Sequence, residues 1–136
     1  MAQNLSYSAV SKAVDAVVKA AQEDGRLPVS IAVVNGHGEL IFFACMDGAP
    51  ERSVPIAINK AYTAARMQRD THEFNKMLKE RERDISWFSD PRFTALGGGA
   101  VVSKEGTKEC LGGVGVSGRT SEEDLEIAHI VLKSLP

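Results

Sequence analysis

The chain has 136 residues, with 43% hydrophobic and 25% charged residues and a formal net charge of −2 from 16 basic and 18 acidic side chains. This length fits one domain, residues 1–136, with a hydrophobic core of its own. The slightly acidic balance gives no basic field for a phosphate backbone, so we expect no nucleic-acid partner. Because no apolar run approaches the ~18 residues of a membrane span and the N-terminus lacks a signal-peptide pattern, we expect a cytoplasmic protein with no membrane partner.

The first third of the chain predicts a helix followed by a β-hairpin. Apolar residues recur at helical spacing from Ser6 or Ser8 to Asp24, and Gly25 ends the pattern. Two runs rich in β-forming residues, 29–34 and 40–45, flank a turn of Asn and Gly residues at 35–38. The two cysteines, Cys45 and Cys110, form no CxxC pair, so we expect buried or half-buried thiols and neither a redox motif nor a zinc site.

The middle of the chain predicts two helices and an irregular segment. Ser53, with Pro55 at the first helical position, begins a helix of about four turns. Its narrow face would let it approach a sheet closely, and Lys60 lies at the edge of that face; the face consists of Ala57, Ala61, Ala64 and Gln68. Thr71 caps a further helix through Leu78, and the charged run 79–84 is a solvated helix end or loop.

The aromatic residues of the irregular segment 85–96 have two interpretations. They plug a core edge or an oligomer interface, or they line a ligand pocket.

The stretch 97–120 holds eight of the twelve glycines. Its strands at 100–103 and 110–117 flank a polar loop, 104–108, which predicts a second hairpin. Glycines within the second strand leave a surface without side chains, against which another backbone, a helix or a small ligand can lie. Thr120 and Glu123 have the spacing of a capping box at the start of a last helix. Two hairpins separated by helices predict an α+β fold with an antiparallel sheet.

Four segments in this spacing resemble the GlcG/HbpS-like family, which includes the C-terminal domain of PduO adenosyltransferases: VSIAVVNGHGELIFFACMDGA, SVPIAINKAYTAARM, LGGGAVV and LGGVGVSGRTSEEDLEIA. The resemblance implies a profilin-like domain with a central sheet of four to five strands, assembling as a homo-oligomer from dimer to octamer. It also implies a link to haem, which several members bind or respond to. Some members are linked to iron storage or release, and many belong to catabolic gene clusters.

The chain departs from the family pattern in places that bear on haem. Asn35 stands where the family commonly has Asp, and Cys45 where it commonly has Arg. Haem coordination in the PduO-type domain is attributed to a histidine in the first part of the chain, and the first predicted helix has none. Haem binding therefore uses another ligand, or this member does not bind haem.

Lys60 is the most informative candidate site residue, because a cation beside a face of small residues needs a partner if it is buried. It either holds a carboxylate-bearing ligand, such as a haem propionate or a small organic acid, or forms a structural ion pair with Asp47 or Glu123. We expect a ligand pocket between the glycine-rich hairpin and the Lys60 helix. The predicted ligand-binding residues are Asp47, Lys60, Thr63, Gly98, Gly99, Gly115, Ser117 and Glu123.

The remaining candidates are weaker. His37 and His72 fit exposed positions, and His129 flanks the apolar stripe of the last helix. We expect no metal site, since no histidine has a second ligand at metal-binding spacing, and the glycines lack a nucleotide-binding context. An anion site around Arg119 is disfavoured by the acids 122–124 that already complement the helix dipole.

Three functions remain open. The first is a small-molecule-binding protein, for haem, another tetrapyrrole, a small aromatic or an organic acid. The second is a catabolic isomerase, lyase or hydrolase with Lys60 or His129 as its acid-base group. The third is an assembly module without a ligand, whose glycines only let helices or subunits approach closely.

Overall fold

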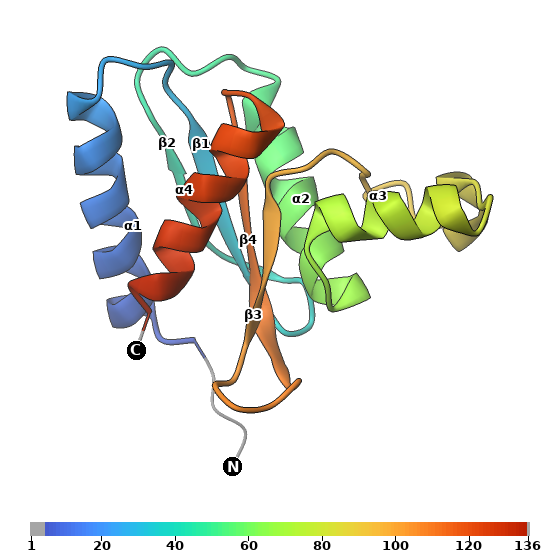
Figure 1. Ribbon diagram of the computed structural model, residues 1–136. Coiled ribbons are helices and arrows are strands. Elements are labelled where there is room, and N and C mark those ends of the chain that lie inside the picture. The colour runs from blue at the N-terminus through green and yellow to red at the C-terminus, as the bar shows by residue number, and fades with distance from the viewer. Residues whose placement is uncertain (1–4, 136) are drawn as a thin grey trace.

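The computed structural model describes residues 5–135 and has a four-stranded antiparallel sheet with helices on both faces (Figure 1). The strand order β2-β1-β4-β3 joins the two predicted hairpins through β1 and β4. The α+β prediction is confirmed, and the sheet has four strands. The elements are α1 (Tyr7–Glu23), β1 (Ser30–Asn35), β2 (Leu40–Cys45), α2 (Ser53–Met67), α3 (Thr71–Glu80), a 3₁₀ turn (Ile85–Phe88), β3 (Gly99–Ser103), β4 (Cys110–Ser117) and α4 (Ser121–Lys133).

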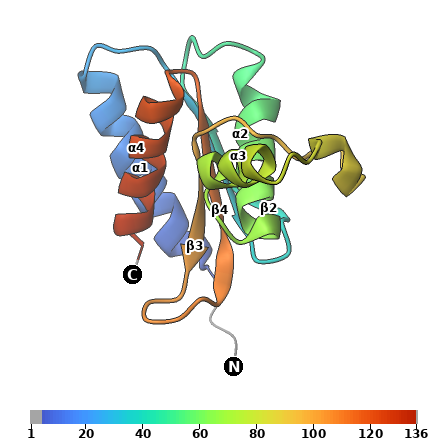
Figure 2. The same ribbon diagram turned by 45° about the vertical axis from the view of Figure 1, so that its right-hand side comes forward.

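Strand residues alternate between two cores, one on each face of the sheet. Ile31 and Val33 of β1 pack in the larger core under α1 and α4, together with Val114 and Val116 of β4. The intervening β1 residues form a smaller core with the alanines of α2. This follows from the two-residue period of a strand, and Figure 2 shows α2 on the side of the sheet away from α1 and α4.

The glycines of β4 lie against the backbone of α2. A Cβ atom at Gly113 would overlap the carbonyl oxygen of Ala61, and one at Gly115 would lie 2.5 Å from the Ala61 nitrogen. The surface without side chains is therefore covered by a helix, one of the three occupants that the sequence allowed. The predicted pocket between the hairpin and the Lys60 helix is wrong, because the helix backbone fills that space.

Most helix starts follow the local signals. The Ser6 hydroxyl accepts a hydrogen bond from the Ala9 N–H at 3.1 Å, and the capping box of Thr120 and Glu123 is present. Thr71 differs from the prediction, since the helix begins there with Asp70 at the N-cap position. The Thr71 hydroxyl is buried and accepts a hydrogen bond from the Gly99 N–H at 2.9 Å, so it ties α3 to β3.

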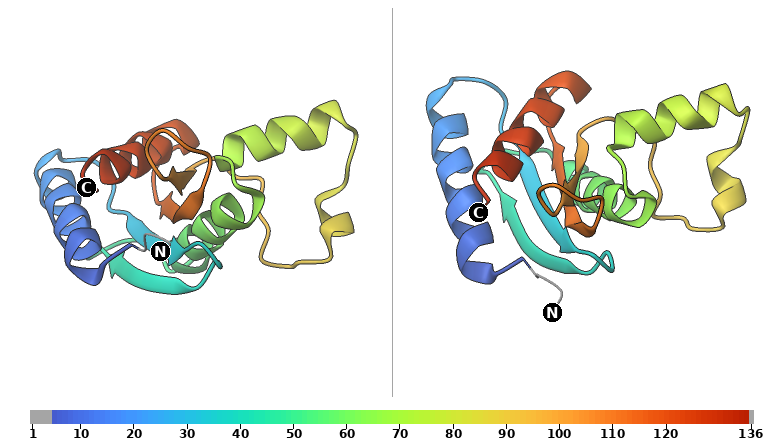
Figure 3. Two further views of the ribbon diagram at one scale, coloured as in Figure 1. Left: turned by 90° about the horizontal axis from the view of Figure 1, so that it is seen from below. Right: turned by 60° about the horizontal axis from the view of Figure 1, so that its bottom comes forward.

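Helix α3 and the 3₁₀ turn project from the side of the sheet (Figure 3). The projection has its own small core, in which Phe74 makes edge-on contacts with Phe88 and Phe93. Two of the aromatic residues of 85–96 thus plug a core edge, whereas Trp87 is 69% exposed. Pro55 is the third residue of α2 and not the first. None of the helices within residues 5–135 is long and apolar enough to span a membrane.

Candidate ligand-binding site

Lys60 is buried between α2, β4 and α4. Its Nζ atom donates to the carbonyl oxygen of Val116 at 2.8 Å and to Oδ2 of Asp124 at 3.2 Å. Both charged side chains are about 96% buried, with exposed fractions of 4% and 3%. Burial lowers the pKa of Lys60, and the nearby Asp124 carboxylate opposes that shift. Lys60 is therefore part of a structural ion pair, the second of the two roles that the sequence left open for it.

The partner of Lys60 is neither of the two that the sequence suggested. Glu123 is used by the capping box, and its backbone position turns its side chain toward Thr120 at the helix start. The next residue, Asp124, points inward, where Oδ1 accepts from the Arg119 N–H at 3.0 Å. Burial raises the pKa of Asp124, with Lys60 opposing. Adjacent residues of a helix point ~100° apart around the helix axis. Which of two adjacent acids faces Lys60 therefore depends on how α4 is rotated about its axis, and the sequence alone does not give that rotation.

Three of the predicted glycines surround Lys60 closely. A Cβ atom at Gly98, whose φ is +121°, would lie 2.7 Å from Nζ of Lys60. At Gly99 it would lie 2.5 Å from the Lys60 carbonyl oxygen, and at Gly115 3.0 Å from the Lys60 Cβ. The structure brings Lys60 and these glycines together, but as a solid contact without space for a ligand.

The other predicted residues lie apart from that contact. The Thr63 hydroxyl accepts from the Thr94 N–H at 3.0 Å and so fixes the segment after the 3₁₀ turn. Ser117 is buried opposite Ser30 at the end of β4. His129 lies 3.0 Å from Asp70, and its side chain is 43% exposed. His37 is exposed in the turn between β1 and β2, and Cys45 is exposed, contrary to our expectation.

Asp47 and Glu123 line two hollows at the end of the sheet where β1 begins and β2 and β4 end. One hollow, of about 550 Å³, contains Glu123, and the other, of about 240 Å³, contains Asp47. Both are lined by Arg26 and Pro28. Together they have the size of a small-molecule site, with Arg26 between them.

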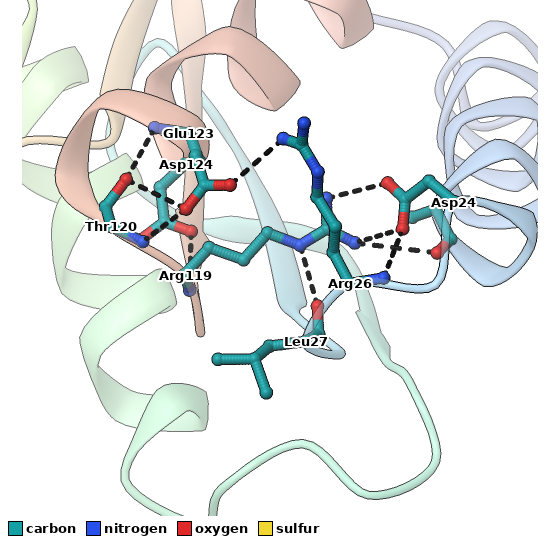
Figure 4. A network of polar contacts seen from close by, with 8 residues as sticks. Asp24, Arg26, Leu27, Arg119, Thr120, Glu123 and Asp124 are labelled. Carbon is teal, nitrogen blue, oxygen red and sulfur yellow. Dashed lines mark hydrogen bonds and ion pairs between the residues drawn. The ribbon is translucent and has the colours of Figure 1, made fainter.

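Arg119 holds this end of the molecule together (Figure 4). Its two terminal nitrogens pair with the two carboxylate oxygens of Asp24 at 2.8 and 3.0 Å, and Nε donates to the Leu27 carbonyl at 2.7 Å. The hydrogen bond from Arg119 holds the pKa of Asp24 below its ordinary value. Because Nε and both terminal nitrogens of its guanidinium already donate hydrogen bonds and only 4% of its side chain is exposed, Arg119 positions the loop and leaves little for a ligand.

Arg26, by contrast, has donors to spare. Its side chain is 59% exposed, and one terminal nitrogen pairs with Oε2 of Glu123 at 3.0 Å. Hydrogen bonds from the Thr120 backbone and hydroxyl hold the pKa of Glu123 below its ordinary value, so this carboxylate is charged at neutral pH. A guanidinium carries five N–H donors in a plane that matches a carboxylate. Arg26 is thus the group in this hollow best suited to binding an anionic ligand.

An apolar groove leads away from the same place, between α1 and α4. The two helices run side by side and antiparallel (Figure 1), so the end of α1 lies beside the start of α4. The groove has a volume of about 310 Å³, and Ala21 lines both this groove and the smaller hollow. Its lining is Ala16, Val17, Ala20, Ala21, Asp24, Ile127, Ile130 and Ser134. No histidine, cysteine or methionine is among these residues.

Little in the sequence predicts this arrangement. Arg26 follows the glycine that ends α1, a position typical of a solvated loop. The sequence indicates Arg119 only as a cation near a helix start, because its partner Asp24 lies 95 residues away. The amphipathic pattern of α1 did predict a buried stripe, and Ala16 and Ala20 lie beside it.

Comparison with known proteins places these features in a family context. A family model described as "Haem degrading protein HbpS-like" matches residues 5–133. Protein GlcG of Escherichia coli K12 is 33% identical over 105 residues, which are 75% of this chain and 75% of GlcG.

Two solved structures share the whole fold. A double mutant of HbpS from Streptomyces reticuli has a TM-score of 0.86 and 31% sequence identity, covering all of this chain and 90% of that one. The complex named PduOC:Heme has a TM-score of 0.85 and 26% identity, covering 98% of this chain and 96% of that one. The resemblance inferred from the four sequence segments is thereby confirmed at the level of family and fold.

Proposed function

We propose, from the premise that this chain belongs to the HbpS-like family, that it binds a tetrapyrrole, haem foremost. The protein contacts the carboxylates and the apolar ring of that ligand. The observation that carries the proposal is the similarity to PduOC, solved as a haem complex, over 98% of this chain. The site we propose is the groove between α1 and α4 together with the hollows around Arg26.

The chemistry of the two surfaces matches the two parts of a haem. The macrocycle is flat and largely apolar, and its two propionates leave from one edge. The groove offers aliphatic side chains such as Val17, Ile127 and Ile130. At its end Arg26 offers unpaired N–H groups, which favour a carboxylate and supply charge-assisted hydrogen bonds. Ile130 is among the most exposed large hydrophobic residues, so a ring covering it removes apolar surface from water.

In this proposal the iron contributes less to the binding affinity than the porphyrin ring does. No described residue lining the groove is a histidine, cysteine or methionine. Met46 lines the smaller hollow, but its sulfur accepts from the Val29 N–H at 3.4 Å. We therefore expect affinity to come from the ring and the propionates, with no histidine bound to the iron.

This expectation leads to a test with three porphyrins. The protein is titrated with hemin, with iron-free protoporphyrin IX and with the dimethyl ester of hemin, following absorption and porphyrin fluorescence. We expect saturable binding of hemin and protoporphyrin IX with affinities within about tenfold of each other, and weaker binding of the ester, whose carboxylates are blocked. Absence of saturable binding of both free acids would refute the proposal. Binding of hemin alone would refute the assignment to this groove, because it would require an iron ligand that the groove lacks.

Two variants locate the site. Arg26→Ala removes the proposed propionate partner and should weaken hemin binding about tenfold or more, by the loss of a charge-assisted hydrogen bond. Lys133→Ala is the matched control, because it removes an exposed cation from another hollow, lined by Leu5, Val102, Lys104 and Leu132 among others. If Lys133→Ala lowers the affinity and Arg26→Ala does not, the ligand lies in that second hollow. Assembly into a homo-oligomer stays a prediction from the family resemblance.

A further inference from the structure

Three side chains with metal-binding atoms gather at the start of α3, away from the groove. A carboxylate oxygen of Asp70, a ring nitrogen of His72 and a carboxylate oxygen of Glu73 all lie within 4.8 Å of one another. His72 and Glu73 are exposed, whereas Asp70 is 9% exposed. The sequence led us to expect no metal site, but at the start of α3 the ligand atoms of these three residues lie close together.

Asp70 is held in place from two other elements. Its Oδ1 atom accepts a hydrogen bond from the Val101 N–H of β3 at 3.0 Å. Its Oδ2 atom lies 3.0 Å from Nε2 of His129 on α4. A carboxylate fixed in this way loses little side-chain entropy on binding a cation, and each oxygen keeps a second lone pair. Outer hydrogen bonds of this kind are typical of carboxylates that bind metals.

We propose that Asp70, His72 and Glu73 bind one divalent transition-metal ion, such as Zn²⁺, and that His129 is a positioning residue for Asp70. One imidazole nitrogen and two carboxylate oxygens are donors that suit this class of ion, with water in the open position. Bond lengths of ~2.0–2.2 Å place two ligands of a tetrahedral ion ~3.4 Å apart. The exposed side chains of His72 and Glu73 have the rotational freedom to close the present separation.

The electrostatics of the helix start limit the affinity but do not forbid the site. Backbone N–H groups make the N-terminus of α3 electropositive, which disfavours a cation. The two carboxylates outweigh that partial charge. The alternative role of Glu73 is only to complement the helix dipole, so its substitution separates the two roles: a metal ligand changes the affinity for the ion, and a dipole partner does not.

The test uses untagged protein without haem, because an affinity tag would itself bind the ion. Zn²⁺ binding is measured by calorimetry and Co²⁺ binding by visible absorption. We expect one ion per chain, with binding weakened at least about tenfold by His72→Ala and by Glu73→Gln. His37→Ala is the matched control, since it removes another exposed histidine, in the turn between β1 and β2, and it should leave binding unchanged. Circular dichroism checks that each variant folds.

His129→Ala tests the positioning role separately. It should weaken Zn²⁺ binding about 10–100-fold while leaving the shape of the Co²⁺ absorption band unchanged, because no ligand atom is lost. A changed band would make His129 a ligand and overturn that role. Failure of Zn²⁺ to saturate at one ion per chain, unchanged binding in Glu73→Gln, or equal loss in His37→Ala would overturn the site.

Discussion

Replacing Asp124 by Asn removes the countercharge of a buried lysine and tests the central packing of the molecule. In the native protein Lys60 and Asp124 are about 96% buried, and Nζ lies 3.2 Å from Oδ2. The variant keeps an oxygen for the Arg119 N–H but leaves the ammonium with the Val116 carbonyl alone. Removing one partner of a buried pair typically costs about 3–5 kcal/mol. Since native domains have unfolding free energies of about 5–15 kcal/mol, the variant should lose a large share of its stability.

The same change should also alter how stability depends on pH. Burial already lowers the pKa of Lys60, and loss of Asp124 removes the charge that opposes this shift. In the variant the folded state therefore binds fewer protons than the unfolded state over a wider range below the ordinary lysine pKa. Stability rises with pH wherever the unfolded state binds more protons. We therefore expect the variant's deficit in unfolding free energy, relative to the native protein, to be largest near neutral pH. This deficit should shrink as the pH rises toward the ordinary lysine pKa.

Urea unfolding followed by circular dichroism at neutral and alkaline pH measures this deficit. Glu80→Gln is the control, because Lys76 and Glu80 form an exposed pair 3.9 Å apart, worth about 0.5 kcal/mol or less. Lys60→Met added to Asp124→Asn should recover most of the loss, since both charges are then gone. A deficit below about 1 kcal/mol at neutral pH, with an unchanged urea slope, would refute the view that Asp124 compensates Lys60.

Three further predictions concern packing, capping and thiol reactivity. Gly115→Ala should lower the unfolding free energy measured in urea by about 3 kcal/mol or more, because the added methyl group overlaps the backbone of α2. Gly97→Ala is the control and should cost far less, because the nearest atom to its methyl group would be a side-chain carbon at 3.2 Å. Thr120→Ala should lower the unfolding free energy by about 0.5–2 kcal/mol through loss of the cap on α4. In a thiol-labelling assay Cys45, which is exposed, should react before Cys110, whose pKa is raised by burial; the opposite order would contradict the fold of β4.

Features set by neighbouring residues were predictable from the sequence. Helix α1 ends at Glu23, one residue before the predicted Asp24, and both hairpins form where alternating strands flank a polar turn. The capping box of Thr120 also forms as predicted. Thr71 is the informative exception, because its hydroxyl is drawn away from the cap by the Gly99 N–H 28 residues later. A tertiary contact there outweighs a local preference.

Features set by distant residues were not predictable in the same way. The sequence identified Lys60 as a cation that needs a partner, but Asp124 became that partner through the phase of α4. The link between His129 and Asp70 joins residues 59 apart, and no local pattern brings them together. The glycines of β4 are ambiguous for the same reason. A surface without Cβ atoms fits a ligand or a helix equally well, and only the position of α2 in the fold shows which of the two covers it.

The residues that carry the family resemblance and those that line the proposed haem site are largely different. Segments 53–67 and 111–128 supply α2, nearly all of β4 and the start of α4, where the glycines and the Lys60 ion pair are needed for close packing. Segment 111–128 also supplies Arg119, Glu123 and Ile127 to the hollows and the groove. The groove and hollows take Arg26 and several side chains from α1, which lies outside the four segments. The fold can thus be retained while the ligand site changes. If the groove is the ligand site that we propose, exposed residues of α1 such as Ala20 determine which ligand fits. A larger side chain at Ala20 should then block ligand binding in the groove without altering the sheet.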